Sequence, residues 1–474
     1  MMQKREAYLE NYWLTFLDFI EVFKELVFED VPLPQLANFY QLLDHDLREE
    51  MSDPEFKKHL NSRILDMAHI QPQYEQWIKP LKMPIETKPG KTLLNYDYLR
   101  FSENNYIKYF DAKQTIIFAR WKRKDYLGIP VHYINDYKVD VSESINSLLE
   151  KANILFKLVD KHPVFGNQYF RTSFLERIRH MVQFIAAVNR YLKENIISCV
   201  VVGTTEDLLS RVLTIIATYL GIPSICMQHG LLGGDEAYIP VFSTKVAVYG
   251  EYEKDWYLKR GLVEDRIAIT GHPRFDDIFT QEHLPKEEFL KLYKLNPKKK
   301  TVLCATQPNY VKQWNELIDI LAQNPLLEIV LKPHPWELSR KPESKLMDNY
   351  YELDNKYESV KLISKKGVNL YDILSNVDMV ITNLSTVGLE TVLAGKPLFM
   401  LSDREFDYYE RLKDYTFTEP AELAKYLTKF IRYKKLQEIA KERGKEFLDY
   451  AYPQKLSGDL LIEEINKMKS VEVL

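Results

Sequence analysis

The feature that most constrains this chain is a regular alternation of short, strongly apolar runs with longer amphipathic segments. Runs such as "ISCVVVG" and "KVAVYG" are rich in β-branched residues, and helical patterns such as "FLERIRHMVQFIAAVNRYLKE" stand between them. Continuous apolar strands separated by amphipathic helices are typical of a parallel sheet that helices cover on both faces. The alternation therefore predicts an α/β fold.

The alternation occurs in two successive series. The first starts near residue 112, and the second starts near residue 301 with "TVLCATQ" and continues through "LEIVLKPHP", "DMVITN" and "KPLFML". The two series share an architecture but not a sequence, and a chain of 474 residues is too long for one compact core. We predict two tandem Rossmann-like domains that face each other across a cleft, where the carboxyl ends of both sets of strands converge.

The first part of the chain lacks this alternation and contains helical patterns instead. The segment "EAYLENYWLTFLDFIEVFKELVF" places aromatic and aliphatic residues at helical spacing. Core packing against the next domain explains this apolar face better than a membrane or partner surface, because few basic residues accompany it. The predicted division is a helical N-terminal extension over 1–95, one Rossmann-like domain over 96–273 and a second over 274–474.

Composition narrows the class of protein. Apolar residues make up 46% and charged residues 28%, which is typical of a globular protein, and a formal net charge of −4 gives no reason to expect a nucleic-acid partner. All three cysteines lie within apolar runs, so we expect buried thiols in a reducing cytosol. The sequence shows neither an apolar stretch of about 18 residues nor the apolar core of a signal peptide. We therefore predict a cytoplasmic protein with at most peripheral membrane association.

Polar residues follow the predicted strands at their carboxyl ends. They form groups at residues 203–207, 228–230, 306–307, 332–335 and 382–386. Ordinary loop chemistry explains any one group, but parallel strands direct their carboxyl ends to one ligand-binding edge. Together the groups predict a binding site.

The stretch "NLSTVGLETVLAGKP", residues 383–397, is the strongest phosphate-binding signal. Asn383 or Ser385 can cap a helix that begins here, and the hydroxyls of Ser385 and Thr386 add donors to the free N–H groups at its positive end. Glu390 follows one turn after Thr386, where its carboxylate can accept hydrogen bonds from ribose hydroxyls. A well-capped helix without a ligand would explain Ser385 alone, but less easily the whole string.

In "LKPHP", Lys332 and His334 stand beside two prolines that rigidify the loop. Such groups can stabilise the negative charge that develops on a departing phosphate. No aspartate-any-aspartate motif of the kind that chelates a divalent metal in nucleotide-sugar transfer follows a predicted strand at the cleft, so we predict metal-independent chemistry without a cofactor. Lys332, His334 and the helix N-terminus would replace the cation.

His229 ends an apolar run, and the glycines of "QHGLLGGDE" give the following loop room for a ligand. An imidazole with a pKa of ~6.5 can remove a proton from an acceptor hydroxyl at neutral pH. A buried structural histidine is the simpler alternative. Glu206 and Asp207, at the end of the neighbouring strand, are rival candidates for the base.

The order of "QHG", "TGHPRFD", "KPHP" and "TNLSTVGLETVLAGKP" resembles that of the two-domain GT-B transferases that build bacterial surface polysaccharides. These include capsule-synthesis proteins and the CDP-glycerol glycerophosphotransferases of teichoic acid assembly. The resemblance covers about residues 197–402, and among such families the chain is most similar to spore-coat polysaccharide biosynthesis proteins of Bacillus. It implies that domain 96–273 holds the acceptor and domain 274–474 the nucleotide donor.

Carried over residue by residue, the resemblance makes His229 a candidate base that faces the acceptor, with Glu206 or Asp207 as carboxylate alternatives, as in the sialyltransferases that also carry an "HP" motif. The expected donor-side residues are Lys332, His334, Ser385, Thr386, Glu390, Thr306, Gln307 and Arg274. The chain has Gln228 where the glycerophosphotransferases have a tryptophan in "WHG", and Ser385 and Thr386 where they have a serine pair. Both departures disfavour a CDP-glycerol donor and favour a sugar nucleotide.

The predicted function is the transfer of a sugar from a nucleotide-activated donor to a growing surface or spore-coat polysaccharide, on a glycan or lipid-linked acceptor, by direct displacement. The alternatives are a CDP-glycerol glycerophosphotransferase, a transferase of CMP-activated acidic sugars of the sialyl or Kdo type, an enzyme like the UDP-N-acetylglucosamine 2-epimerases, and a catalytically silent scaffold. The sequence leaves open the donor nucleotide, the acceptor and a homo-oligomeric state.

Overall fold

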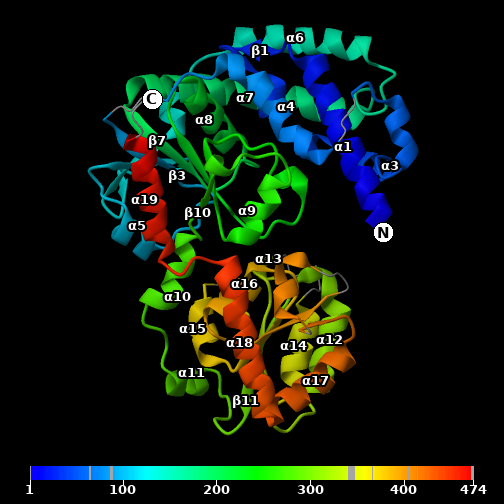
Figure 1. Cartoon of the computed structure of the whole chain (residues 1–474), viewed down its shortest axis with the longest axis vertical. Helices are drawn as coiled ribbons and strands as arrows, with labels where there is room; N and C mark the ends of the chain where they lie inside the picture. Colours follow the sequence, from blue (N-terminus) through cyan, green and yellow to red (C-terminus); the bar gives the residue numbers. More distant parts are fainter. Residues whose placement is uncertain are drawn as a thin grey trace. The chain divides into compact units, whose positions relative to one another are not determined.

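The computed structural model describes residues 2–62, 66–85, 89–339, 347–365, 367–402, 406–413 and 415–470. The chain forms two compact units (Figure 1), of which the first comprises Met1–Tyr249, Glu253–Arg274 and Ser457–Leu474 and the second comprises Gly250–Tyr252 and Phe275–Leu456. Each unit contains a largely parallel sheet with helices around it. The predicted α/β fold with two Rossmann-like parts and a helical N-terminal region is confirmed.

The first unit is built on an eight-stranded sheet with the order β10-β9-β8-β7-β3-β4-β6-β5. Its strands are β3 (Lys91–Asn95), β4 (Thr115–Ala119), β5 (Asp125–Tyr126), β6 (Ile129–Tyr133), β7 (Ile197–Val202), β8 (Ser224–Met227), β9 (Lys245–Val248) and β10 (Ile267–Ile269). Neighbours pair in parallel except β5, which is antiparallel to β6. The chain runs outward from β3 through β4 and β6 and then crosses to β7 on the other side of β3. The strand order therefore reverses between β3 and β7, and open α/β sheets bind ligands at such a switch point.

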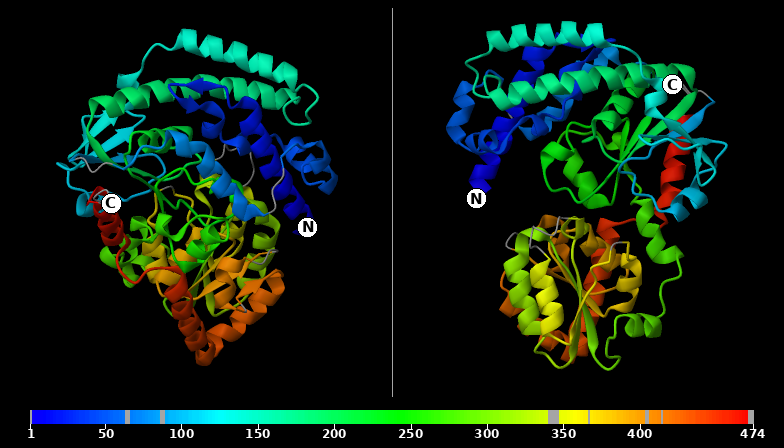
Figure 2. Two further views of the ribbon diagram at one scale, coloured as in Figure 1. Left: turned by 45° about the horizontal axis from the view of Figure 1, so that its top comes forward. Right: turned by 180° about the vertical axis from the view of Figure 1, so that it is seen from behind.

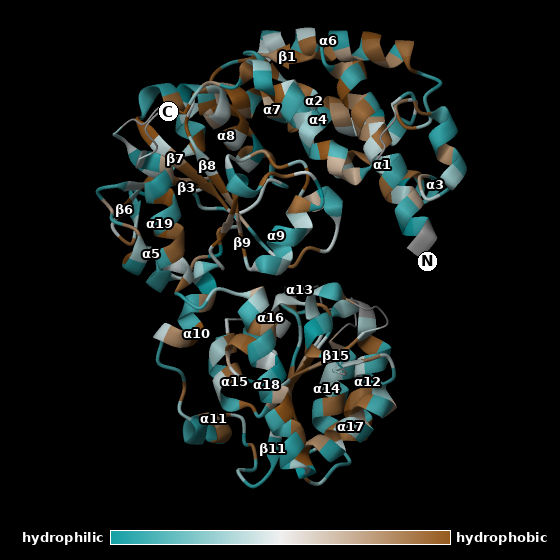
Figure 3. Ribbon diagram, in the orientation of Figure 1, coloured by the Kyte–Doolittle hydropathy of each residue, from teal (hydrophilic) through white to brown (hydrophobic). Residues whose placement is uncertain are grey.

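Alternate residues of the inner strands belong to different cores, one on each face of this sheet. The helices that follow the strands are α5 (Glu103–Tyr109), α6 (Ser142–Leu158), α7 (Gln168–Glu194), α8 (Leu208–Tyr219), α9 (Glu251–Leu258) and, at the far end of the sequence, α19 (Ser457–Ser470). Val200 and Val202 join the core that includes α7 and α8, whereas Cys199 and Val201 join the core that includes α19. This period of two is what a strand buried on both faces requires. Figure 3 shows the apolar strands inside the more polar helices.

Helix α19 covers the first unit although it follows the second unit in the sequence. Leu461, Ile465 and Met468 are buried against the sheet face that holds Leu94 and Val201. The structure differs here from the expected domain boundaries, which assigned 457–474 to the C-terminal domain and 91–95 to the helical extension. The physical reason is that β3 is an inner strand of the sheet and that one apolar face of the sheet takes its cover from the stripe on α19.

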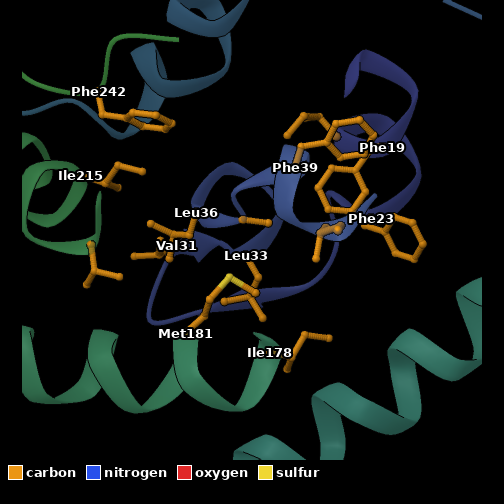
Figure 4. Close-up of a cluster of buried hydrophobic side chains, with 14 of the residues drawn as sticks. Phe19, Phe23, Val31, Leu33, Leu36, Phe39, Ile178, Met181, Ile215 and Phe242 are labelled. Atoms are coloured by element: carbon orange, nitrogen blue, oxygen red, sulfur yellow. The ribbon is translucent and has the colours of Figure 1, made fainter. Parts of the chain in front are cut away.

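The N-terminal region belongs to the first unit and shares the core on one face of its sheet. It contains α1 (Met2–Phe23), β1 (Val27–Phe28), β2 (Val31–Pro32), α2 (Leu33–Leu36), α3 (His45–Glu50) and α4 (Ile70–Ile78). Phe19 of α1 lies with its ring centroid 5.0 Å from that of Phe174 on α7, within a cluster of aromatic and aliphatic side chains (Figure 4). The interpretation of the aromatic helix as core packing is confirmed. Figure 2 shows α6 lying along α7 on the outside of this region.

A buried arginine ties the N-terminal region to the loop after β7. Arg211 of α8 is 6% exposed, and its guanidinium donates to the carbonyl oxygens of Ala37 at 2.6 Å and Thr205 at 2.8 Å. Burial lowers the pKa of Arg211 to about 10, so the group stays charged at neutral pH. Asn38 also donates from Nδ2 to the carbonyl oxygen of Glu206 at 3.2 Å. The N-terminal region therefore supports one of the predicted site loops.

The second unit is built on a six-stranded parallel sheet with the order β13-β12-β11-β14-β15-β16. Its strands are β11 (Lys300–Ala305), β12 (Leu327–Lys332), β13 (Val360–Leu362), β14 (Met379–Thr382), β15 (Leu398–Leu401) and β16 (Thr416–Phe417). Its helices are α10 (Asp277–Thr280), α11 (Lys286–Leu292), α12 (Val311–Leu321), α13 (Pro335–Ser339), α14 (Asp348–Lys356), α15 (Leu370–Asn376), α16 (Thr386–Leu393), α17 (Pro420–Arg432) and α18 (Lys434–Ala451). The strand order reverses between β11 and β14, which is the switch point of this unit. Within the described ranges, no helix has the length and apolarity that a membrane crossing requires.

Candidate functional site

Three of the predicted polar groups leave neighbouring strands of the second unit at the same sheet edge. Ala305, the last residue of β11, pairs with Lys332 of β12 and with Thr382 of β14. The backbone N–H of Thr306 donates to the carbonyl oxygen of Lys332 at 3.1 Å, and Thr382 Oγ1 donates to that of Ala305 at 3.1 Å. Because adjacent strands lie about 4.8 Å apart, the segments that follow them start side by side at the switch point.

Helix α16 begins at this edge, and Ser385 is its N-cap. The Oγ atom of Ser385 accepts a hydrogen bond from the N–H of Val387 at 3.3 Å, and Thr386 is the first helical residue. Asn383, the other predicted cap, is instead buried, and its Oδ1 accepts from the indole N–H of Trp314 at 2.9 Å. Ser385 and Thr386 therefore stand at the positive end of a helix, where an anion is stabilised.

Gly388 allows a tyrosine to approach the first turn of α16. A Cβ atom at this position would lie 2.4 Å from the hydroxyl oxygen of Tyr409, which donates to the carbonyl oxygen of Ser385 at 2.9 Å. The glycine thus serves contact with Tyr409. Glu390 lies farther along α16 and is only 6% exposed. Its role as a nucleotide contact stays a prediction.

Lys332 and His334 lie at the end of β12 and in the loop after it, and both are half-buried. Burial lowers the pKa of Lys332 and is the main cause that lowers the pKa of His334; the neighbouring Lys332 charge adds to the effect on His334, and Glu337 opposes it. The backbone N–H of Trp336 donates to Nδ1 of His334 at 3.2 Å. A neutral imidazole with an accepting Nδ1 carries its proton on Nε2, so His334 presents an N–H donor.

A buried glutamate that sequence reasoning missed holds two of these loops together. Glu337 of α13 is fully buried, and its carboxylate accepts from the backbone N–H of His334 at 2.7 Å, from Thr306 Oγ1 at 3.0 Å and from the hydroxyl of Tyr350 at 3.0 Å. Thr306 is buried and turns its hydroxyl to Glu337, whereas Gln307 next to it is half-buried. In "HPWE" this acid looks like an ordinary first-turn helix residue, so the sequence offers no specific signal for it.

In the first unit, the predicted base His229 and its predicted rival Glu206 are partners. His229 follows β8 and Glu206 follows the adjacent β7, and His229 Nε2 lies 3.1 Å from Glu206 Oε2. The imidazole also stacks on Tyr238, with ring centroids 5.1 Å apart and planes at 16°. Side-chain exposures of 17% for His229 and 38% for Glu206 leave both groups accessible to a ligand. A carboxylate that holds one nitrogen of an imidazole orients the other nitrogen for proton transfer.

Asp207, the second rival, is occupied by structural contacts. Its Oδ2 caps α8 by accepting from the N–H of Ser210 at 3.1 Å, and its Oδ1 lies 2.5 Å from Nη2 of Arg120. Arg120 also lies 3.3 Å from Asp97, whose pKa is raised chiefly by burial and less by the Asp207 charge. Both carboxylate oxygens of Asp207 are therefore engaged, and its side chain is only 10% exposed.

Backbone geometry brings the loops after β3 and β7 into contact at the switch point. A Cβ atom on Gly203 would lie 2.2 Å from the backbone of Tyr98, so only glycine permits this approach. Arg100, in the same loop as Tyr98, donates from Nη1 to the carbonyl oxygen of His229 at 2.8 Å. Gln228 is buried and donates to the carbonyl oxygen of Gly230 at 2.8 Å, which shapes the turn that carries His229.

These loops open on a cavity of about 570 Å³ that is lined by His229, Glu206 and Asp207 among others. Gln41 from the N-terminal region and residues of α7 complete its wall.

Arg274, which was expected on the donor side, belongs to the first unit. It lies in the 3₁₀ helix Pro273–Asp276, and its backbone N–H donates to Nδ1 of His272 at 3.2 Å. Among the residues that the structure describes, no three His, Cys, Asp or Glu side chains gather as a metal site would require.

Comparison with known proteins places the sequence match in the second unit. Residues 308–409 match the family described as capsule polysaccharide biosynthesis protein, and this stretch contains Lys332, His334, Ser385, Thr386 and Glu390. A search of curated proteins found no match to the chain.

Solved structures share the fold over about four fifths of the chain. A putative UDP-N-acetylglucosamine 2-epimerase from Listeria monocytogenes is 12% identical with a TM-score of 0.52, over 81% of this chain and 97% of that one. The two-unit fold is that of the GT-B proteins. Anabaena Alr3699/HepE in complex with UDP and glucose is 14% identical with a TM-score of 0.51, over 81% and 100% of the chains. S. aureus MnaA, in a co-structure with UDP, is 12% identical with a TM-score of 0.51, over 80% and 96%.

The family match over residues 308–409 confirms the predicted resemblance to proteins of surface-polysaccharide biosynthesis, and the solved structures confirm the predicted GT-B fold. At these identities the solved structures show the fold alone. The spore-coat relationship stays a prediction.

Proposed function

We propose that this protein is a glycosyltransferase of surface-polysaccharide biosynthesis that moves a sugar from a nucleotide-activated donor to a glycan or lipid-linked acceptor. The observation that carries the proposal is the His229–Glu206 pair, 3.1 Å apart and lining a cavity of about 570 Å³. A base beside a cavity of this size suits an acceptor hydroxyl that must lose its proton. A silent scaffold would have no use for such a pair.

The donor side of the proposal rests on the edge of the second unit. His334 Nε2–H, the Lys332 ammonium and the first turn of α16 are the groups that would meet the departing phosphate, and they act on charge that grows in the transition state. The family match covers this edge. Because two proteins of similar fold were solved with UDP, UDP-sugars are the first donors to test.

The proposed reaction is a single displacement at the anomeric carbon of the donor sugar. With Glu206 bound to Nε2–H of His229, Nδ1 takes the proton of the acceptor hydroxyl. The acceptor oxygen bonds to the anomeric carbon while the bond from that carbon to the phosphate oxygen breaks, and its electron pair leaves on the nucleotide. The imidazolium that results is stabilised by the Glu206 carboxylate, 3.1 Å away.

The test is nucleotide release measured with and without acceptor. The protein is incubated with UDP-glucose, UDP-N-acetylglucosamine, CDP-glycerol and a CMP-activated acidic sugar, each with a panel of short glycans and lipid-linked sugars. A transferase releases nucleotide only when a suitable acceptor is present, and thermal-shift measurements with the free nucleotides identify the one that stabilises the protein. Interconversion of a UDP-sugar without release would instead indicate an epimerase, and neither activity with any donor would contradict the proposal.

A further inference from the structure

The cavity that holds His229 has a second wall, which the proposed reaction does not use. Arg177, His180 and Phe184 of α7 all line it. Their spacing of three and four residues puts them on one face of the helix. In sequence this face looks like the solvated side of an amphipathic helix, and only the fold brings it to the catalytic pair.

The arginines that line the cavity differ in whether they have an acidic partner. Among the residues that the structure describes, the only partner of the Arg177 guanidinium is the neutral carboxamide of Gln41, at 2.7 Å from Nη2. By contrast, Arg120 on the same cavity lies within ion-pair distance of Asp207, and Glu206 is paired with His229. The acids that line the cavity are thus engaged by other groups, and among the described residues the Arg177 guanidinium has no anionic partner.

Aromatic and imidazole side chains accompany this charge. Phe184 and Leu208 both line the cavity. Phe184 is half-buried, and the guanidinium carbon of Arg120 lies 5.8 Å from its ring centroid, so the part of the ring that Arg120 and the core leave exposed is available to the apolar face of a sugar. His180 is exposed on the same helical face and adds a hydrogen-bonding group. A guanidinium matches the two oxygens of a carboxylate or phosphate in a fork, which a neutral hydroxyl cannot reproduce.

We propose that the α7 wall is the acceptor subsite and that it selects an acceptor sugar that carries an anionic group, a phosphate or a carboxylate. Phe184 packs on the sugar ring, Arg177 binds the anionic substituent, and a hydroxyl of the same sugar reaches His229. This inference rests on the proposed transferase function, because it names the class of acceptor for that reaction.

Binding experiments test the subsite without requiring turnover. Isothermal titration of the wild-type protein uses methyl glucoside, methyl glucuronide and glucose 1-phosphate as probes, which separate a neutral sugar from the two anionic sources. We expect one of the anionic sugars to bind at least about tenfold more tightly than the neutral one, since hydrogen bonds between charged groups are stronger than those to a neutral hydroxyl. Equal affinity for all three sugars would overturn the proposal.

Variants on one helix supply the matched control. Arg177→Gln removes the charge that faces the cavity, whereas Arg179→Gln removes an exposed charge that does not line it. We expect Arg177→Gln to lose about tenfold or more in affinity for the anionic sugar, Arg177→Lys to lose less, and Arg179→Gln to bind like wild type. Phe184→Leu should weaken binding of every sugar and gives a second test should Arg177→Gln be unstable.

UDP binding distinguishes this wall from a donor site. Thermal stabilisation by UDP should be equal in wild type, Arg177→Gln and Arg179→Gln. If Arg177→Gln loses UDP stabilisation and keeps sugar binding, the wall serves the donor and the proposal fails. If anionic sugars bind through Arg177 but no donor is turned over, the subsite stands and the transferase function fails.

Discussion

The two units have the same strand order around their switch points but hold their polar groups in different ways. In the first unit, acids face the cavity and pair with His229 and Arg120. In the second unit, the acid nearest the strand ends, Glu337, is buried beneath the loop and accepts three hydrogen bonds, so that the groups left at the edge are donors. We propose that one topology here supports two chemistries, proton transfer in the first unit and anion binding in the second.

The largest effect on transfer activity is expected from substitution of His229, the proposed base in the first unit. His229→Ala should lower transfer by about a hundredfold to ten-thousandfold while nucleotide binding stays close to wild type, because the proposed nucleotide contacts belong to the other unit. Steady-state rates and UDP thermal shifts measure the two quantities. An inactive Asp207→Asn beside an active His229→Ala would assign the base to a carboxylate.

In the second unit, His334→Ala should lower turnover by about a hundredfold, with a smaller effect on donor affinity. The reason is that the lost N–H donor stabilises charge that appears mainly in the transition state. Separate measurement of kcat and KM for the donor checks this, and circular dichroism checks the fold. His45→Ala, at an exposed histidine of α3, is the control. Wild-type turnover in His334→Ala would remove this residue from the mechanism.

The sequence predicts both His229 and His334 as site residues, because the pattern that marks each of them lies within a few neighbouring residues. A strand end followed by polar residues, and a serine before an apolar helical run, are signals within a few residues, so the strand ends and the Ser385 cap could be predicted. The pairing of His229 with Glu206 joins loops more than twenty residues apart, and α19 covers a sheet that the chain left almost two hundred residues earlier. Only the fold reveals such contacts. For the same reason, Arg177 looked like a surface charge.

The next largest effect is expected on the stability of the second unit, where the buried Glu337 carboxylate accepts three hydrogen bonds. Glu337→Gln places an amide where three donors point, and we expect a loss of about 1–3 kcal/mol in the unfolding free energy of the second unit. Calorimetry measures it, and Glu352→Gln, at an exposed position of α14, should have no effect. An unchanged second-unit transition in Glu337→Gln would show that the buried acid does not order the loop.

A smaller effect is expected from pH. Burial lowers the pKa of His334 from 6.5 in the free protein, whereas a bound pyrophosphate favours the imidazolium and raises it. Binding then takes up a proton, so the affinity for UDP-glucose should increase, by up to about tenfold, as the pH falls toward the lowered pKa of His334 in the free protein, and should level off below it. The pyrophosphate diester does not titrate in this range. Isothermal titration at several pH values should show this slope in wild type and lose it in His334→Gln.

The smallest expected effect is that of chelation. If Lys332, His334 and the α16 terminus supply the positive charge, activity should survive EDTA with no measurable change. Complete loss, restored by magnesium or manganese, would contradict this part of the comparison.

The position of α19 has a consequence for biosynthesis on the ribosome. Residues 275–456 of the second unit are translated between β10 and α19, so one face of the sheet in the first unit stays uncovered until they have been made. At about 5–20 residues per second, the apolar surface around Leu94 and Val201 stays open for roughly ten seconds or more after β10 has been made. A nascent chain stalled in this interval would expose that surface to chaperones, and a stop codon before Ser457 would leave it exposed permanently.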